Sequence, residues 1–180
     1  STTGFLFAIG GTDRRSPSDS VCTYDPGALS WSTRVPQLPA PRCGHGAASF
    51  YWTSEYAFAR WFILVVGGTT GENDNGGWSN RTDLYDNYEV AWMAPGSTPE
   101  LSVPRQFPAV AAIGAYVYVV GGVNGKGVLN SAEVYNHDSN DWKPIVPVPP
   151  AMAGAAIGLM PVAPRCNPSD VGGGNVCDKC

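Results

Sequence analysis

One pattern of glycine, tyrosine and tryptophan occurs three times along the chain and restricts its fold more than any other feature. In each copy an apolar run ends in a glycine pair, a polar stretch follows, and a tyrosine then precedes a tryptophan by seven residues. These positions are Gly10, Gly11, Tyr24 and Trp31 in the first copy, Gly67, Gly68, Tyr85 and Trp92 in the second, and Gly121, Gly122, Tyr135 and Trp142 in the third. Such spacing indicates one supersecondary unit that is repeated.

The residues of the repeat predict short, tightly connected strands. The run Phe62 to Val66 has no polar alternation, which predicts a strand that is buried on both faces. The glycine pair that follows it permits positive φ and close approach of the backbone. With 22 Gly, 16 Pro and 11% aromatic residues, the composition also favours strands and turns over helices.

These landmarks resemble the kelch family, whose repeat is a four-stranded blade marked by a glycine pair and a spaced Tyr and Trp. The resemblance covers roughly residues 4 to 160. It implies an all-β fold: a kelch-type β-propeller segment of about three four-stranded blades plus a further first strand. Kelch repeats are expected over residues 1–164, and a Cys-rich tail or junction over 165–180.

The strands can be placed on this template. Blade one (4–34) is expected to lack its first strand and to contain strands at 4–10, 20–25 and 30–34; blade two (44–93) has them at 44–52, 61–67, 82–86 and 90–93; blade three (108–144) at 108–113, 116–121, 131–136 and 141–144; and an extra strand follows at 153–160. Thr53 to Arg60 is expected to form an added surface feature of blade two. Open strand edges at both ends predict that further blades of a longer chain, a second copy or a protein partner complete the propeller.

In an antiparallel blade, the loop between the second and third strands and the link to the next blade lie at the same end. The resemblance implies that this loop face carries the binding site. The candidate contact residues are Arg14, Arg15, Asn73, Asp74, Asn75, Trp78, Asn124 and Lys126. The alternative is that each is an ordinary solvated loop residue. Arg42 and Arg105 are expected to anchor links by donating hydrogen bonds to carbonyls.

The sequence offers little for catalysis. No nucleophile, zinc-protease or phosphate-binding motif is present, and we expect no enzyme activity, no cofactor and no metal. The chain has only two histidines; His45 is expected to be buried and His137 to be exposed in a turn. The net charge is −4, without a basic cluster, and no apolar run is long enough to span a bilayer, so nucleic acid and membrane insertion are disfavoured.

The cysteines indicate whether the protein is located outside or inside the cell. Cys22, Cys43, Cys166, Cys177 and Cys180 are disulfide candidates, and Asn80 lies in an Asn-x-Thr sequence that is typical of N-glycosylation. Together they predict an extracellular or secreted kelch scaffold for protein–protein recognition or assembly, with a glycan as a further candidate ligand. One alternative is a carbohydrate-binding or galactose-oxidase-like secreted propeller. The other is an intracellular kelch adaptor, in the cytoplasm, with reduced thiols.

Overall fold

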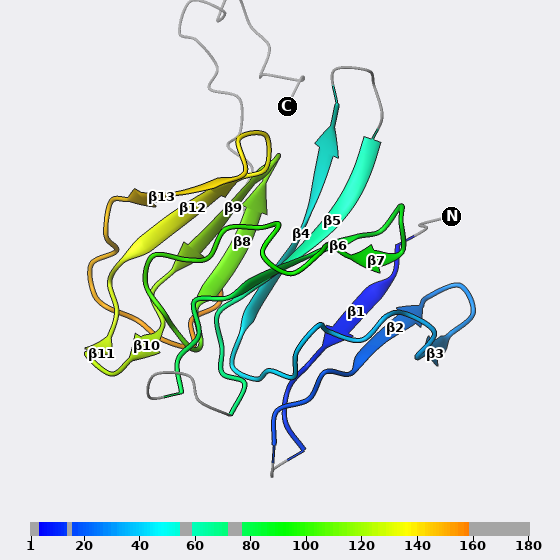
Figure 1. Cartoon of the computed structure of the whole chain (residues 1–180), viewed down its shortest axis with the longest axis horizontal. Helices are drawn as coiled ribbons and strands as arrows, with labels where there is room; N and C mark the ends of the chain where they lie inside the picture. The colour runs from blue at the N-terminus through cyan, green and yellow to red at the C-terminus, as the bar shows by residue number, and fades with distance from the viewer. Residues whose placement is uncertain (1–3, 14–15, 55–58, 72–76, 159–180) are drawn as a thin grey trace, which may run out of the picture.

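The computed structural model describes residues 4–13, 16–54, 59–71 and 77–158. Within these ranges the regular secondary structure consists of strands, which form three antiparallel sheets and one short hairpin (Figure 1). The sheets are blade one, with β1 (Leu6–Ile9), β2 (Val21–Asp25) and β3 (Ser30–Ser32); blade two, with β4 (Gly46–Thr53), β5 (Ala59–Val66), β6 (Thr82–Asp86) and β7 (Ala91–Trp92); and blade three, with β8 (Ala109–Ile113), β9 (Tyr116–Val120), β12 (Ala132–Asn136) and β13 (Asp141–Ile145). The hairpin joins β10 (Val123–Asn124) to β11 (Gly127–Val128).

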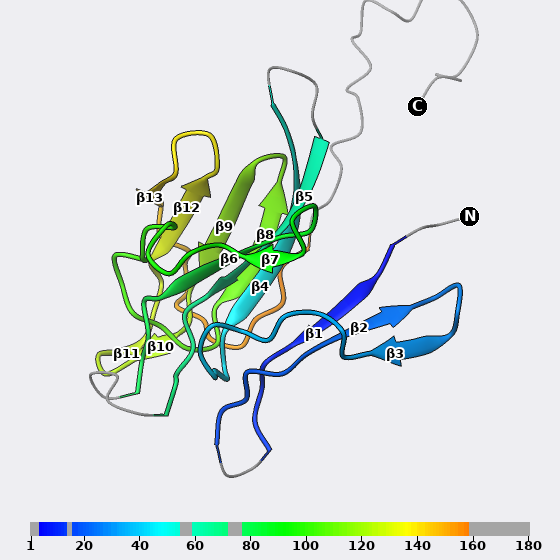
Figure 2. The same ribbon diagram turned by 45° about the vertical axis from the view of Figure 1, so that its right-hand side comes forward.

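Each four-stranded blade is a simple meander in which consecutive strands of the blade pair. Blade two runs β4-β5-β6-β7, and blade three has the same order with β10–β11 inserted between its second and third strands. Blade one has three strands among the described residues, in the order β1-β2-β3, and no described strand pairs with the free edge of β1. Figure 2 shows the blades following one another in a row, with blade one and blade three at its two ends.

The core lies between neighbouring blades. Strand β5 is buried from Phe62 to Val66, as the sequence predicted. Alternate side chains of this strand face opposite ways, so Phe62, Leu64 and Val66 pack toward blade three while Ile63 and Val65 pack toward blade one. The middle blade is therefore apolar on both faces because it has a neighbour on each.

The repeated tyrosine and tryptophan lie side by side in every blade. Their ring centroids are 5.2 Å apart for Tyr24–Trp31 and 5.3 Å apart for both Tyr85–Trp92 and Tyr135–Trp142. The indole nitrogens then reach the preceding link: Trp92 Nε1 donates to Pro36 O at 3.1 Å, and Trp142 Nε1 to Pro99 O at 2.8 Å. Each of these tryptophans thus joins its own blade to the link before it.

Three features differ from the predicted layout. The sequence predicts a loop between the second and third strands of blade three, but Val123–Asn124 and Gly127–Val128 pair there as the hairpin β10–β11. The strand expected at 153–160 is not formed over residues 153–158, because no neighbouring strand is available there for pairing, and residues 159–160 lie outside the described residues. In blade two, β4 and β5 continue in register as far as Thr53 and Ala59, so part of the expected surface insertion extends the sheet; residues 55–58 are not among those described.

In the part of the chain that the structure describes, no helix is long and apolar enough to cross a membrane.

Candidate functional site

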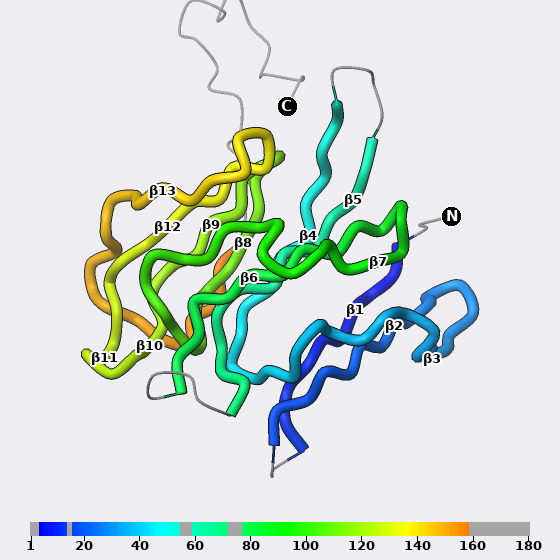
Figure 3. Tube along the Cα trace, viewed as in Figure 1, coloured from blue at the N-terminus to red at the C-terminus, as the bar shows by residue number. Residues whose placement is uncertain are grey.

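The loops between second and third strands and the links between blades lie at one end of the molecule, as expected (Figure 3). The same backbone contact holds each link to the loop of the blade before it. Leu38 N donates to Asp19 O, Leu101 N to Asn80 O and Val148 N to Asn130 O, each at 2.8 Å. We call this end the loop face.

Two buried arginines fix the links to the blades. Arg105 Nη1 donates to Gly121 O at 2.8 Å and to Ser131 O at 3.0 Å, which is the carbonyl anchoring that the sequence predicted. Its Nη2 also forms an ion pair with Glu133 Oε1 at 2.7 Å, which the sequence did not reveal. Burial lowers the pKa of Arg105, and Glu133 opposes that shift.

Arg42 is arranged in the same way one blade earlier. It pairs with Asp83 of β6, and both side chains are almost fully buried. In both cases an arginine of one link meets a carboxylate on the third strand of the next blade. We call this contact the arginine–carboxylate clamp.

Three of the predicted contact residues are described and lie near one another on the loop face. The six-membered ring of Trp78 lies against Gly125, which is between Asn124 and Lys126; a Cβ on Gly125 would be 3.1 Å from the ring. Asn124 Nδ2 donates to Pro104 O at 3.0 Å, and Asn124 Oδ1 accepts from Lys126 N at 2.9 Å. Asn124 therefore shapes the hairpin, whereas the Lys126 side chain is exposed. The remaining candidates, Arg14, Arg15, Asn73, Asp74 and Asn75, lie outside the described residues.

Phe107 belongs to this region and was not singled out from the sequence. Its φ is +51°, a conformation that is costly for a bulky side chain, and its side chain is 50% exposed. The equivalent positions in the other two links are Gly44 and Gly154, with φ of +63° and +66°. The equivalence follows from the backbone, since Phe107 N donates to Gly44 O and Gly154 N donates to Phe107 O.

The neighbour of Phe107 links it to the other residues. Gln106 Nε2 donates to Gly77 O, beside Trp78, and Gln106 exchanges two backbone hydrogen bonds with Val123, beside Asn124. We call Trp78, Phe107, Asn124 and Lys126 the loop-face patch. Comparison of the links in the sequence could have found Phe107, because it is the second residue after Arg105 just as Gly44 is the second after Arg42.

The histidines occupy two separate packed sites. Burial, and to a smaller extent the charge of Arg42, lower the pKa of His45 to about 4, while a hydrogen bond with the Ile9 backbone opposes the shift. His137 is not exposed as expected: its ring packs 4.5 Å from that of Phe62 and 5.2 Å from that of Trp52, and burial lowers its pKa. Among the residues that the structure describes, no three His, Cys, Asp or Glu side chains form a metal-binding group.

The structure also shows the surroundings of two of the cysteines and of the predicted glycosylation residue. Cys22 and Cys43 are free thiols, so a disulfide through either is not formed, while Cys166, Cys177 and Cys180 lie outside the described residues. Asn80 Nδ2, the atom that would carry a glycan, donates to Glu100 Oε2 at 2.9 Å.

Comparison with known proteins identifies the repeat. A family model described as the kelch motif matches residues 104–149, which include blade three. Kelch-like protein 41a of Danio rerio is 29% identical over 140 residues, and the match covers 77% of this chain and 21% of that protein. Kelch-like protein 4 of Homo sapiens is 38% identical over 79 residues, covering 44% of this chain and 11% of that protein.

A solved structure shares the fold. The structure of YjhT superposes with a TM-score of 0.59 at 17% identity, over 86% of this chain and 53% of that one. The chain spans about a fifth or less of the two curated relatives, and about half of this solved chain. The repeated landmarks, the antiparallel blades and these matches lead to one conclusion: the chain belongs to the kelch-repeat family and forms three blades of a kelch-type β-propeller.

Proposed function

We propose that this chain is a non-catalytic recognition module that binds a protein partner through its loop-face patch. The single observation that carries the proposal is Phe107, a half-exposed aromatic side chain in a strained backbone conformation where the other two links have glycine. Strain of this kind persists where the surroundings impose it, and it clusters at functional sites.

The composition of the patch suits a protein ligand. Trp78 and Phe107 supply apolar area, and aromatic residues are enriched at the energetic centres of protein interfaces. Lys126 adds an exposed positive charge beside them, in a chain whose net charge is −4. This favours an extended peptide segment with an apolar anchor and an acidic residue.

We further propose the intracellular adaptor role in place of the extracellular one. Two free thiols, Cys22 and Cys43, are compatible with a reducing compartment, and the kelch-like relatives support an adaptor. Thiol counting on the natively expressed protein, denatured without reductant, should return five free cysteines. A count of three or fewer would return the extracellular alternative to first place.

The binding role can be tested with a phage-displayed random peptide library panned against the chain. Enriched peptides should bind the unmodified chain and lose at least tenfold in affinity to Trp78→Ala and Phe107→Asn; asparagine tolerates positive φ, so the second variant removes the ring but keeps the backbone. Tyr88→Ala is the matched control, because Tyr88 is also an exposed aromatic but lies in the turn between β6 and β7, at the opposite end of the blade. Equal loss in all three variants, or no loss in any, would argue against the loop-face patch as the binding site.

A further inference from the structure

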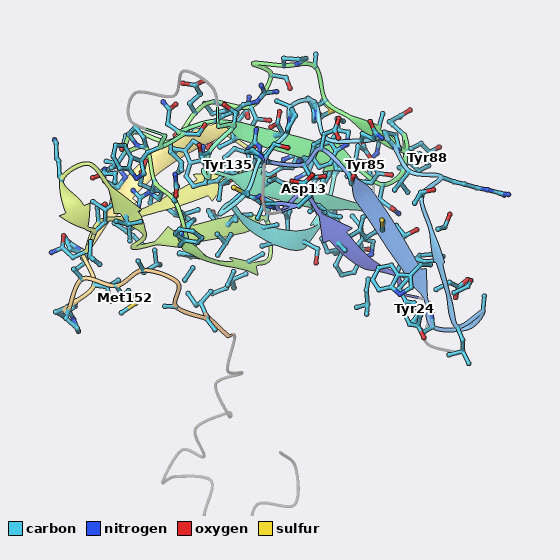
Figure 4. The ribbon with its side chains drawn as sticks, turned by 90° about the horizontal axis from the view of Figure 1, so that it is seen from below. Asp13, Tyr24, Tyr85, Tyr88, Tyr135 and Met152 are labelled. Carbon is cyan, nitrogen blue, oxygen red and sulfur yellow. The ribbon has the colours of Figure 1, made fainter. Side chains whose placement is uncertain are left out.

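The two ends of the row of blades are complementary to each other. Figure 4 shows Tyr24, in blade one, and Met152, in the link after blade three, at opposite ends of the molecule. A single copy therefore does not bring them together. At each internal junction, by contrast, a link and the next blade meet through the arginine–carboxylate clamp and through the tryptophan hydrogen bond.

The clamp position of blade one carries no charge. Cys22 pairs with Ala8, two residues before the glycine pair, just as Asp83 pairs with Val65 and Glu133 with Val119. Blade one thus has a thiol where blades two and three have the carboxylate. An arginine that approached this side of blade one would find no acid to pair with.

The clamp position of the last link carries no charge either. Met152 O accepts from Gly122 N, just as Arg105 O accepts from Gly68 N and Arg42 O from Gly11 N. Methionine therefore replaces the arginine in the link after blade three. A carboxylate on an approaching blade would be left buried without a cation, which is strongly unfavourable.

The hydrogen bond from the tryptophan indole to a link carbonyl is also not formed at these two ends. Trp31 is 59% exposed, while its equivalents Trp92 and Trp142 are half-buried against a link carbonyl. In the first two links this carbonyl belongs to the residue two positions before the backbone donor, namely Pro36 before Leu38 and Pro99 before Leu101. In the last link the donor is Val148, so the corresponding carbonyl is that of Val146, whose side chain is 85% exposed. The donor on one end and the acceptor on the other are both open.

The free edge of β1 also has space for the strand that blade one lacks. A groove of about 230 Å³ lies between β1 and β4, lined by residues of both strands and by Ile63. At the other end of the row, Gly154 N donates to Phe107 O as Phe107 N donates to Gly44 O, so the chain at 152–154 follows the path by which links one and two enter β4 and β8. Residues 156–158 come next, with Ile157 exposed.

We propose that two copies of this chain join head to tail, twice, and close one ring of their six blades. At each of the two equivalent junctions, residues 156–158 of one copy pair with β1 of the other, Met152 packs on Cys22, and Trp31 donates to the Val146 carbonyl. The superposition on 53% of the solved chain agrees with a segment that represents about half of a propeller. A second copy fits this junction better than a blade with the usual clamp, because it leaves no buried charge unpaired.

The test is the mass of the 180-residue chain by size-exclusion chromatography with light scattering, across a range of concentrations. The unmodified chain should form a dimer, at twice the 19.0 kDa of one copy. Cys22→Asp and Met152→Arg should each weaken association at least about a hundredfold by burying an unpaired charge. Cys22→Asp/Met152→Arg should recover the dimer, because it recreates the clamp that blades two and three use.

Met93→Arg is the matched control for Met152→Arg: Met93 is an exposed methionine at the outer edge of blade two, away from both ends, and its replacement should leave the dimer intact. Circular dichroism and tryptophan fluorescence separate loss of folding from loss of association. A monomer at every concentration, an open-ended polymer, or a double variant as dissociated as either single variant would each overturn the proposal.

Discussion

At the residue scale, the two buried arginines do more than the sequence indicated. Arg105 donates to Val103 O, Gly121 O, Ser131 O and Glu133, so one side chain joins link two to the second and third strands of blade three. A rigid guanidinium with five donors suits this position, since it satisfies carbonyls and a carboxylate at once. Lysine could not make the same set of contacts.

Removing one partner of this buried clamp should therefore cost much more than removing an exposed ion pair. We expect Arg105→Met to lower the free energy of unfolding by about 3–5 kcal/mol, because Glu133 is left buried without its cation. Arg105→Met/Glu133→Gln should recover part of that loss. Lys143→Ala is the control: its pair with Asp141 is exposed, and the change should cost under about 1 kcal/mol. Urea denaturation gives the values, and similar losses for Arg105→Met and Lys143→Ala would contradict the role given to the clamp.

The histidines predict how stability depends on pH. The pKa of His45 is lowered to about 4 in the folded chain, from an ordinary value of 6.5, so the unfolded chain takes up the proton first as the pH falls. The contribution of neutral His45 is fully present above pH 6.5 and is lost progressively between about pH 6.5 and 4, by roughly 3 kcal/mol in all.

Urea denaturation between pH 7.5 and pH 5, above the range in which most carboxylates titrate, should show stability falling as the pH is lowered. His45→Gln should flatten this dependence. The pKa of His137 is shifted in the same direction, so His137→Gln should flatten it further when the two changes are combined. Stability that rises on acidification in this range, or that is unchanged by His45→Gln, would show that His45 is not held neutral by the fold.

At the element scale, the strands of the blades follow closely from the sequence. The apolar run, the glycine pair and the Tyr-to-Trp step place every strand of blades two and three within a few residues of its observed bounds, because each landmark has a local physical cause. Phe62–Val66 is an example, since only a strand with a blade on each side buries such a run.

The contacts between distant positions could not be predicted in this way. The pairing of Arg105 with Glu133 depends on the register of β9 with β12, and the packing of His137 on Phe62 depends on how blade three leans on blade two. Three residues of the loop-face patch, Trp78, Asn124 and Lys126, were singled out from the sequence, and their binding role stays a prediction. Phe107 was missed, although it stands in the sequence where the other two links have glycine. The sequence of residues 153–158 looks like that of a paired strand. These residues form no strand because no neighbouring strand lies beside them, and a local pattern cannot reveal that.

The first glycine of each pair has a role that its φ alone does not explain. A Cβ on Gly67, at φ of +66°, would lie 2.5 Å from Arg105 O, while Gly10 has the same relation to Arg42 O at 2.7 Å. Gly114 also has positive φ, +58°, but has open space around its would-be Cβ. Gly67 and Gly114 thus have similar φ and differ mainly in that link two lies close to Gly67.

We expect Gly67→Ala to lower the free energy of unfolding by about 3 kcal/mol or more, because backbone strain and a clash with a fixed carbonyl add together. Gly114→Ala should cost only about 1 kcal/mol, from backbone strain alone. Thermal and urea denaturation of the two variants would measure the difference. Equal costs would show that link two can move away from the glycine without penalty, and would weaken the view that the links are rigidly seated.

At the scale of the whole molecule, the repeat leaves two unlike ends, and the chemistry at these ends decides what can join them. Inside the row, charge on one blade is matched by charge on the preceding link. At the ends, the uncharged residues Cys22 and Met152 stand where the equivalent positions carry a carboxylate and an arginine. Neutral residues at both ends make a junction between them possible without the cost of an unpaired buried ion.

This arrangement makes a prediction for individual backbone amides of β1. Gly10 N donates to Ser20 O, so the amides of Leu6 and Ala8 face β2, and those of Phe7 and Ile9 face the free edge, where the second copy's strand is proposed to pair. Hydrogen exchange measured by NMR should therefore find Phe7 and Ile9 poorly protected in dilute samples and increasingly protected as the concentration rises. Their equivalents Leu64 and Val66, which face β4 within the same copy, should be protected throughout. In the Cys22→Asp variant the protection of Phe7 and Ile9 should no longer depend on concentration. If these two amides exchange equally fast in dilute and concentrated samples of a chain that forms a dimer, the copies join through another surface and the edge of β1 stays open.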